Sequence, residues 1–177
     1  MGKGYCIECN ADNVEVRPVQ GGRAFVCEKC LSTYSKKWIN KKFPDLPENA
    51  EGNATVERAI SYMGKSHDEI DCSTLIFNSL PDKKLPKESA AQYYKSDKLV
   101  PVDTKDLRKG DLIFFKRDDG LENINHVGIV LGVGNDGTIT FIHSSSSKGV
   151  SISNTNHIGG YGKSTWGQLK KGFRRPK

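Results

Sequence analysis

The chain of 177 residues has 27 lysine and arginine side chains against 21 aspartate and glutamate, a net charge of +6, and 36% of its residues are hydrophobic. This length allows one domain of ordinary size, or one domain with a small accessory module. The longest apolar runs, such as residues 127–133, are too short to cross a bilayer, which argues against membrane-spanning helices.

The basic charge favours an anionic partner, which could be nucleic acid, a membrane surface or a cell-wall polymer, and it does not choose among them. The chain starts with MGKGYCIEC, which lacks the apolar stretch of a signal peptide. We therefore expect synthesis in the cytoplasm, followed by retention there or by export along another route.

Four of the five cysteines form two Cys-x2-Cys pairs separated by 17 residues: Cys6, Cys9, Cys27 and Cys30. Two such pairs joined by a hairpin supply the tetrahedral sulfur ligands of a structural zinc ion. Two alternating runs, 14–19 and 23–26, flank a Gly21-Gly22 turn and predict that hairpin. The pattern therefore predicts a zinc ribbon over residues 1–35, with two disulfides or redox dithiols as the rival interpretations.

The predicted ribbon carries few basic residues before Lys36. We therefore expect a structural or protein-docking role for it and no nucleic-acid partner. Residues 36–53 are charged and interrupted by Pro44 and Pro47, which indicates a linker or a short helix.

The second domain is expected over residues 54–177, opening with a helix from Thr55, as N-cap, through Met63. A second helix is predicted from about Cys72 to Pro81, and a short helical piece over 88–94. From Asp111 onward the pattern alternates as in strands: DLIFF, HVGIVLGV, a Gly-Asn-Asp-Gly turn, TITFIHS and VSIS. Helices followed by antiparallel strands predict an α+β domain.

The remaining cysteine, Cys72, stands where the second helix should start. A helix N-terminus stabilises a thiolate, which is the form that attacks a carbonyl, and its free N–H groups can hold the resulting oxyanion. A buried structural cysteine is the alternative for any isolated thiol.

The segment DCSTLIFNSL resembles the nucleophile motif of NlpC/p60 cysteine peptidases, in which Asp-Cys-Ser-Gly-Leu is usual. Further segments resemble the rest of that family in the same order: LPKESAAQYY, LRKGDLIFF, HVGIVLG, FIHSSSSKGVSIS and STWGQLKKGFRR. The resemblance runs from about residue 55 to residue 175. It implies a papain-like fold with Cys72 as nucleophile, His126 as general base and His143 as the residue that orients His126. We also expect Asp71 and Ser73, which flank the nucleophile, to contact the substrate.

Strand parity provides a separate test of the histidine pair. Side chains two residues apart share a face, so His126 and Gly128 point to one side of their strand. If residues 134–137 form the hairpin loop symmetrically, Gly128 lies opposite His143, and Thr138 lies opposite Val133. The histidines then lie diagonally on one face, within about 7–8 Å at Cα.

The chain departs from the family pattern in two ways. Thr74 replaces the usual glycine after Cys-Ser, and the stretch before Cys72 lacks the segment that commonly supplies a tyrosine near the oxyanion. Tyr62 and His67 are the nearby candidates to replace it. His157 is interpreted as a surface histidine.

By resemblance, the expected reaction is hydrolysis of peptidoglycan stem peptides between D-glutamate and the diamino acid, without a catalytic cofactor. The alternatives are an amidase or acyltransferase acting on another substrate, and an inactive zinc-ribbon binding protein, against which the three retained catalytic residues argue. Three settings for this activity remain open. The protein could be exported as an antibacterial effector with a delivery or immunity protein, act in phage-type lysis, or recycle wall peptides inside the cell. We expect a monomer.

Overall fold

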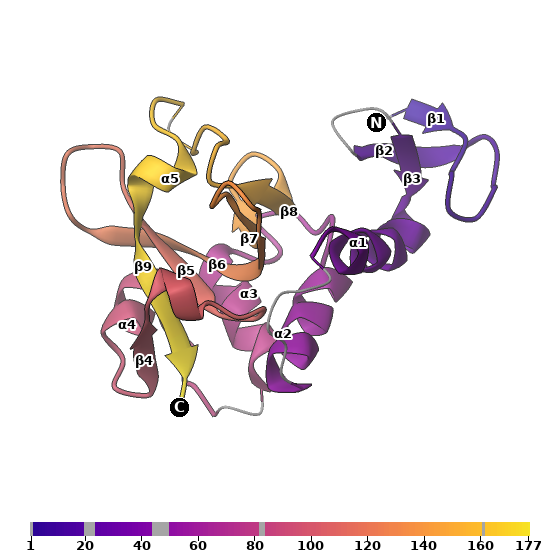
Figure 1. Ribbon diagram of the computed structural model, residues 1–177. Helices are drawn as coiled ribbons and strands as arrows, with labels where there is room; N and C mark the ends of the chain where they lie inside the picture. Colours follow the sequence, from indigo (N-terminus) through magenta and orange to yellow (C-terminus); the bar gives the residue numbers. More distant parts are fainter. Residues whose placement is uncertain (1, 20–23, 44–49, 82–83, 161) are drawn as a thin grey trace. The chain divides into compact units, whose positions relative to one another are not determined.

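A computed structural model describes residues 2–19, 24–43, 50–81, 84–160 and 162–177 of the chain (Figure 1). It divides into two compact units, Met1–Lys42 and Phe43–Lys177. The first unit extends beyond the expected boundary at residue 35 because one continuous helix, α1 (Glu28–Lys42), follows its last strand. Within the described residues, no helix has the length and apolar character needed to span a membrane.

The first unit contains an antiparallel sheet formed by β1 (Gly2–Gly4), β2 (Val14–Val19) and β3 (Ala24–Cys27). Its small core consists of two valines and two cysteines: Val16, Val26, Cys6 and Cys27. The predicted strands are thus present, and β1 is an addition; the predicted Gly21-Gly22 turn lies outside the described residues. A sheet whose buried cluster is half thiols is too small to fold on hydrophobic burial alone.

The second unit packs helices on an antiparallel six-stranded sheet with the order β4-β9-β5-β6-β7-β8, and the predicted α+β class is confirmed. Its helical elements are α2 (Ala50–Ser61), α3 (Cys72–Ser79), α4 (Ala90–Lys95), the 3-10 helix η3 (Thr104–Asp106) and α5 (Trp166–Leu169). Its strands are β4 (Leu99–Val102), β5 (Leu112–Lys116), β6 (Ile124–Val133), β7 (Ile139–Ser145), β8 (Gly149–Asn154) and β9 (Lys170–Pro176).

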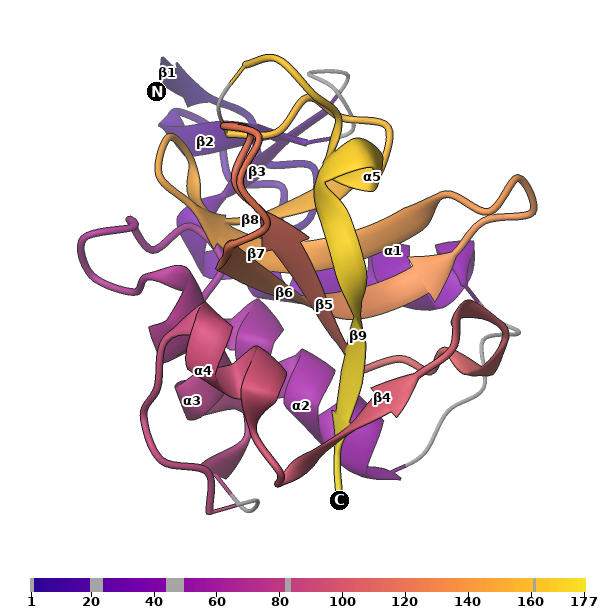
Figure 2. The ribbon, with the colours of Figure 1, turned by 90° about the vertical axis from the view of Figure 1, so that its left-hand side faces the viewer.

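Helices α2, α3 and α4 lie together on one face of this sheet (Figure 2). On β5, Phe114 faces them and contacts Tyr94 of α4, with ring centroids 5.2 Å apart. Its neighbour Phe115 instead packs against Trp166 of α5, at 4.8 Å between centroids. Because successive strand residues point to opposite faces, α5 covers the face that the other helices leave open.

Helix α2 begins earlier than predicted, at Ala50. Thr55 is therefore not its N-cap: its hydroxyl donates to the Glu51 carbonyl, 3.0 Å away, from inside the helix. Strands β4 and β9 were not predicted as strands, because Pro101 and the basic residues of LKKGFRR hide their alternation.

A bulge in β6 sets the register of the β6–β7 hairpin. Val133 lies opposite Ile139, which corrects the predicted pairing of Val133 with Thr138, and the register then shifts between Val130 and Gly132. The extra residue restores the predicted register, so that Ile129 pairs with Ile142. The next positions along the strands are Gly128 and His143, and a Cβ on Gly128 would lie 3.3 Å from the His143 Cβ.

The segment that leads to Cys72 is fastened to β8 and β7. Gly64 N donates to Val150 O at 3.1 Å, and Val150 N donates to Lys65 O at 2.9 Å. Farther along, the Ser144 hydroxyl donates to the Ile70 carbonyl. Gly149 permits this approach, since a Cβ at that position would lie 2.0 Å from the Lys65 oxygen.

We predict that Gly149→Ala destabilises the protein more than Gly137→Ala. Both glycines have a positive φ, +66° and +84°, which costs an alanine about 1 kcal/mol or more. Gly137 has open space beyond it, whereas an alanine at position 149 must also displace the Lys65 carbonyl. Urea denaturation should show a loss of about 1 kcal/mol for Gly137→Ala and of at least twice that for Gly149→Ala. Equal losses would contradict the close approach.

Candidate active site

Cys72 is the first residue of α3, and Asp71 is the N-cap of that helix. The Asp71 carboxylate accepts hydrogen bonds from Thr74 N at 2.7 Å and from the Ser73 hydroxyl at 3.0 Å. Burial raises the pKa of Asp71, but these hydrogen bonds outweigh it, so the pKa lies below its ordinary value. Asp71 and Ser73 therefore fix the start of the helix, and their contact with substrate stays a prediction.

The Cys72 thiol is partly buried and reaches the backbone of β6, where the N–H of Val127 hydrogen-bonds to the sulfur. That N–H is accessible because the paired positions of β6 and β7 run only as far as Ile129 and Ile142. Burial has the largest influence on the thiol and raises its pKa. The hydrogen bond from Val127 lowers the pKa, whereas the charge of Asp71 raises it further. The backbone N–H groups of Ser73 and Cys72, at the start of α3, lower the pKa as expected of a helix N-terminus, but desolvation outweighs them.

His126 and His143 are joined by a hydrogen bond of 2.7 Å between His126 Nε2 and His143 Nδ1. The other nitrogen of His143, Nε2, lies 3.1 Å from the Ser153 hydroxyl. If His126 Nδ1 is to accept a proton, its Nε2–H must donate to His143, whose Nε2–H then donates to Ser153. One consistent pair of tautomers therefore leaves the base nitrogen free.

Ser153 was missed in the sequence, where it is one of several serines near the end of the sheet. The parity of VSIS places Ser151 and Ser153 on one face of β8, and the pairing of His143 with Ser151 leaves Ser153 one step along that face. Ser153 could therefore have been predicted from the alternation of side chains along β8 combined with the register of its pairing with β7.

Burial lowers the pKa of His126 to about 4, and the charge of His67 adds to the effect. Burial also lowers the pKa of His143 well below its ordinary value, with smaller contributions from His126, Lys148 and His157. At neutral pH both imidazoles are therefore uncharged and the Cys72 thiol is protonated. The resting site is a neutral thiol–imidazole arrangement, in which the proton moves only when the nucleophile is used.

Aromatic rings enclose the histidine pair. The Trp166 indole stacks on the His126 ring, with centroids 5.0 Å apart and 22° between planes, and meets His143 edge-on at 5.3 Å. Phe115 lies 5.9 Å from His126 and tilts toward it by 37°. Sequence reasoning missed this role of Trp166, because the residue reaches the site only through the tertiary fold.

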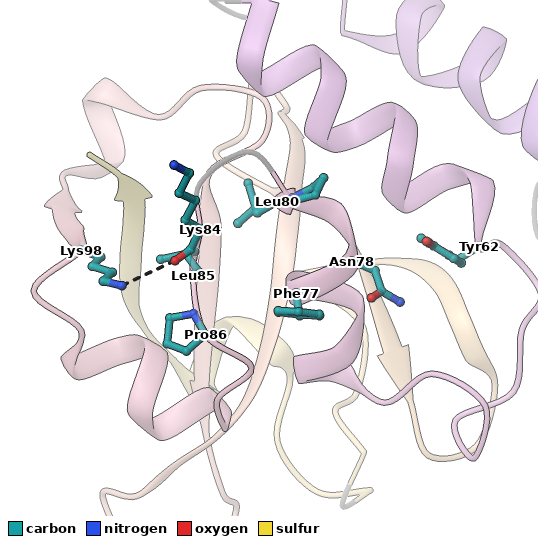
Figure 3. A pocket seen from close by; sticks show the side chains of 9 residues that line it. Tyr62, Phe77, Asn78, Leu80, Lys84, Leu85, Pro86 and Lys98 are labelled. Atoms are coloured by element: carbon teal, nitrogen blue, oxygen red, sulfur yellow. Dashed lines mark hydrogen bonds between the residues drawn. The ribbon is translucent and has the colours of Figure 1, made fainter.

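The two candidates for the missing oxyanion tyrosine lie in different surroundings. Tyr62 lines a separate pocket of about 490 Å³ with Phe77 and Asn78, on the C-terminal half of α3 (Figure 3). His67 lies close enough to His126 to influence its pKa. The His67 Nδ1 atom is buried and has no hydrogen-bond partner among the described residues. His157 is exposed, in line with its interpretation as a surface histidine, and its ring lies within hydrogen-bond distance of Asn154.

In the first unit the sulfur atoms of four free cysteines lie within 4.8 Å of one another: Cys6, Cys9, Cys27 and Cys30. The Cys9 and Cys27 sulfurs are 3.9 Å apart, which is too far for a disulfide of about 2.05 Å. Tetrahedral zinc–sulfur bonds of about 2.3 Å require sulfurs about 3.8 Å apart. Cys27 N also donates to the Cys6 sulfur at 3.3 Å, a bond that favours the thiolate. This donor set fits a metal ion.

A helix that begins with a cysteine, next to two adjacent strands that each bear one histidine of a hydrogen-bonded pair, is the layout of papain-like thiol hydrolases. Residues 57–170 match the NlpC/P60 family, and the chain belongs to that family.

Over 100 residues the chain is 34% identical to the probable endopeptidase NlpC of Escherichia coli (strain K12), an alignment that covers 55% of this chain and 59% of that relative. The match thus spans less than two thirds of that protein.

Solved structures agree on the fold. An NlpC/P60 family protein from Bacillus cereus ATCC 10987 superimposes with a TM-score of 0.52 at 26% identity, covering 75% of this chain and 42% of that one. NlpC1 from Trichomonas vaginalis gives a TM-score of 0.52 at 25% identity, covering 73% and 45% respectively. The resemblance found in the sequence is confirmed.

We predict that iodoacetamide alkylates Cys72 slowly near neutral pH, because only the thiolate reacts and burial raises the pKa of the thiol. The rate should rise about tenfold per pH unit between about pH 7 and about pH 9. Mass spectrometry of the peptide that contains Cys72 separates this reaction from those of the other thiols. The control variant His126→Ala should keep the same pH profile. A rate that is already level from about pH 5 upward, and that depends on His126, would reveal a preformed ion pair instead.

Proposed function

We propose that this protein is a cysteine peptidase that hydrolyses peptide bonds in the stem peptides of bacterial peptidoglycan. Two observations carry the proposal: the Cys72 sulfur is hydrogen-bonded to the backbone of Val127, the residue after His126, and His126, His143 and Ser153 are joined by hydrogen bonds. Membership of the NlpC/P60 family and the similarity to a probable endopeptidase support the choice of a peptide bond.

In this reaction His126 Nδ1 takes the thiol proton as the Cys72 sulfur attacks the scissile carbonyl carbon, forming a tetrahedral oxyanion. The imidazolium keeps its Nε2–H bonded to His143, whose own N–H is bonded to Ser153. His126 then returns its proton to the departing amine, which leaves a thioester. A water molecule, deprotonated by His126, hydrolyses the thioester and restores the thiol.

The oxyanion needs donors that are already in place. The Cys72 backbone N–H, at the start of α3, is one such donor. We assign the second to His67, whose ring lies near His126 and whose Nδ1 atom is buried without a described partner. Tyr62 lines another pocket and is the weaker candidate.

We infer further that the scissile bond joins D-glutamate to the diamino acid. The resemblance of the catalytic motifs supports this bond, and the net charge of +6 suits an anionic cell wall. Action as a delivered antibacterial effector, with an immunity protein as partner, belongs to the same proposal and needs a test in living cells.

We propose zinc as the metal of the first unit. The four sulfurs fit its tetrahedral geometry, and thiolate ligands suit zinc among the divalent ions. The ion would stabilise the fold of a module whose core is very small, and a role in docking to another protein is compatible with this.

We predict that Cys72→Ala lowers turnover of purified wall peptides by more than about 10⁴-fold, and that His126→Ala does nearly the same. His143→Ala should cost less, about 10²-fold, because the thiol can still pass its proton to a less well oriented His126. His143→Asn and His143→Gln should retain more activity, since each keeps a side-chain acceptor. Mass spectrometry of the fragments measures turnover and identifies the bond cut, and circular dichroism checks the fold.

Wild-type turnover by Cys72→Ala would show that Cys72 is not the nucleophile. Cleavage of non-wall amides alone would favour the other amidase function.

We predict one zinc ion per chain in protein purified without chelator, measured by elemental analysis. Cys6→Ser should lower the zinc content, because it removes a buried ligand. The matched variant Cys72→Ser should retain the full content, because its thiol lies outside the four-sulfur cluster. Protein without zinc, or with another metal in its place, would contradict the assignment.

A further inference from the structure

Trp166 is nearly buried, with 6% of its surface exposed, and its indole covers one face of the His126 imidazole. The same indole meets Phe115 at 4.8 Å and Phe141 at 6.0 Å between centroids. Both phenylalanines belong to the core on this face of the sheet. The indole that contacts the histidines is thus held in place by its packing against Phe115 and Phe141.

The backbone of Trp166 is held equally firmly. Its N–H donates to the His157 carbonyl at 2.9 Å, and the next N–H, of Gly167, donates to Thr155 O at 2.8 Å. Thr165 and Gln168 form a capping box around the short helix α5. A Cβ at Gly167 would lie 2.9 Å from the Thr155 oxygen, so a glycine permits this close seating.

A hydrogen bond at one ring nitrogen does not fix an imidazole completely. The 2.7 Å bond to His143 holds Nε2 of His126 but leaves the ring free to turn about the line between the two nitrogens. The stacked indole blocks that rotation, because the planes are only 22° from parallel. With both constraints present, the ring orientation is fixed, and Nδ1 lies on the edge of the ring away from the bond to His143.

The indole also bears on the charge that appears during the reaction. His126 is uncharged at rest and lies among aromatic rings, so its imidazolium form loses hydration. The face of an indole attracts a cation placed about 5 Å away, and tryptophan does so more strongly than phenylalanine. The stack is therefore stronger when His126 carries the proton than when it does not.

We propose that Trp166 is a positioning residue for the base: its indole sets the orientation of the His126 ring and stabilises the imidazolium formed when Cys72 is deprotonated. This rests on the proposed function. Since the indole acts on the base, its loss should affect kcat much more than KM.

The test compares Trp166→Leu and Trp166→Phe with Phe173→Leu, a control in the same core cluster. Trp166→Leu should lower kcat about 10- to 100-fold with KM within about twofold, and Trp166→Phe about threefold. Phe173→Leu should reduce stability while leaving kcat per folded molecule within about twofold. Trp38→Phe, which changes the other tryptophan of the chain, should match wild type. Should Trp166→Leu fail to fold, the comparison of Trp166→Phe with Phe173→Leu decides.

A double-mutant cycle distinguishes positioning from a purely structural role. If Trp166 and His143 orient the same ring, the loss of kcat in Trp166→Leu combined with His143→Ala should be clearly smaller than the product of the two single losses. Multiplicative losses, or a Trp166→Leu enzyme with kcat within about twofold of wild type, would overturn the inference. Failure of the proposed function is distinguishable, because then Cys72→Ala would not abolish the activity on wall peptides.

Discussion

The geometry of the site depends on the bulge in β6 between Val130 and Gly132. Starting from the pairing of Val133 with Ile139, an unbroken ladder would set His143 opposite Ile129, so that these two side chains would share a face of the sheet. His126 would then point to the other face, and the two imidazoles could not meet. The extra residue between Val130 and Gly132 shifts the parity and puts both histidines on one face, 2.7 Å apart at their nitrogens.

The balance of forces at the site favours neutral groups. Burial raises the pKa of Cys72 and lowers that of His126, so desolvation opposes an ion pair from both sides. The attack of the sulfur on the substrate must therefore coincide with the transfer of the proton, and the surroundings of His126 matter most at that moment. The hydrogen bonds to His143 and Ser153 and the aromatic enclosure are the groups positioned to assist it.

Much of the site could be predicted because its signals are local. Cys72 follows a capping aspartate, and the histidine pair follows strand alternation, so motif and parity were enough. The bulge at Leu131, the partnership of Ser153 and the stacking of Trp166 could not be predicted, since each depends on the register of distant strands or on the path of a loop. Thr55 shows the limit of local rules: it resembles a cap, yet the helix begins at Ala50 and runs through Gly52 and Asn53 despite their low helix propensity.

The attachment of the segment before Cys72 to β8 has a mechanical consequence. The hairpin of β7 and β8 carries His143 and Ser153, and through Val150 and Ser144 it also holds the backbone on either side of His67. These hydrogen bonds couple the backbone before the nucleophile to the strands that carry the two partners of the base, so that a displacement of the hairpin would move both together.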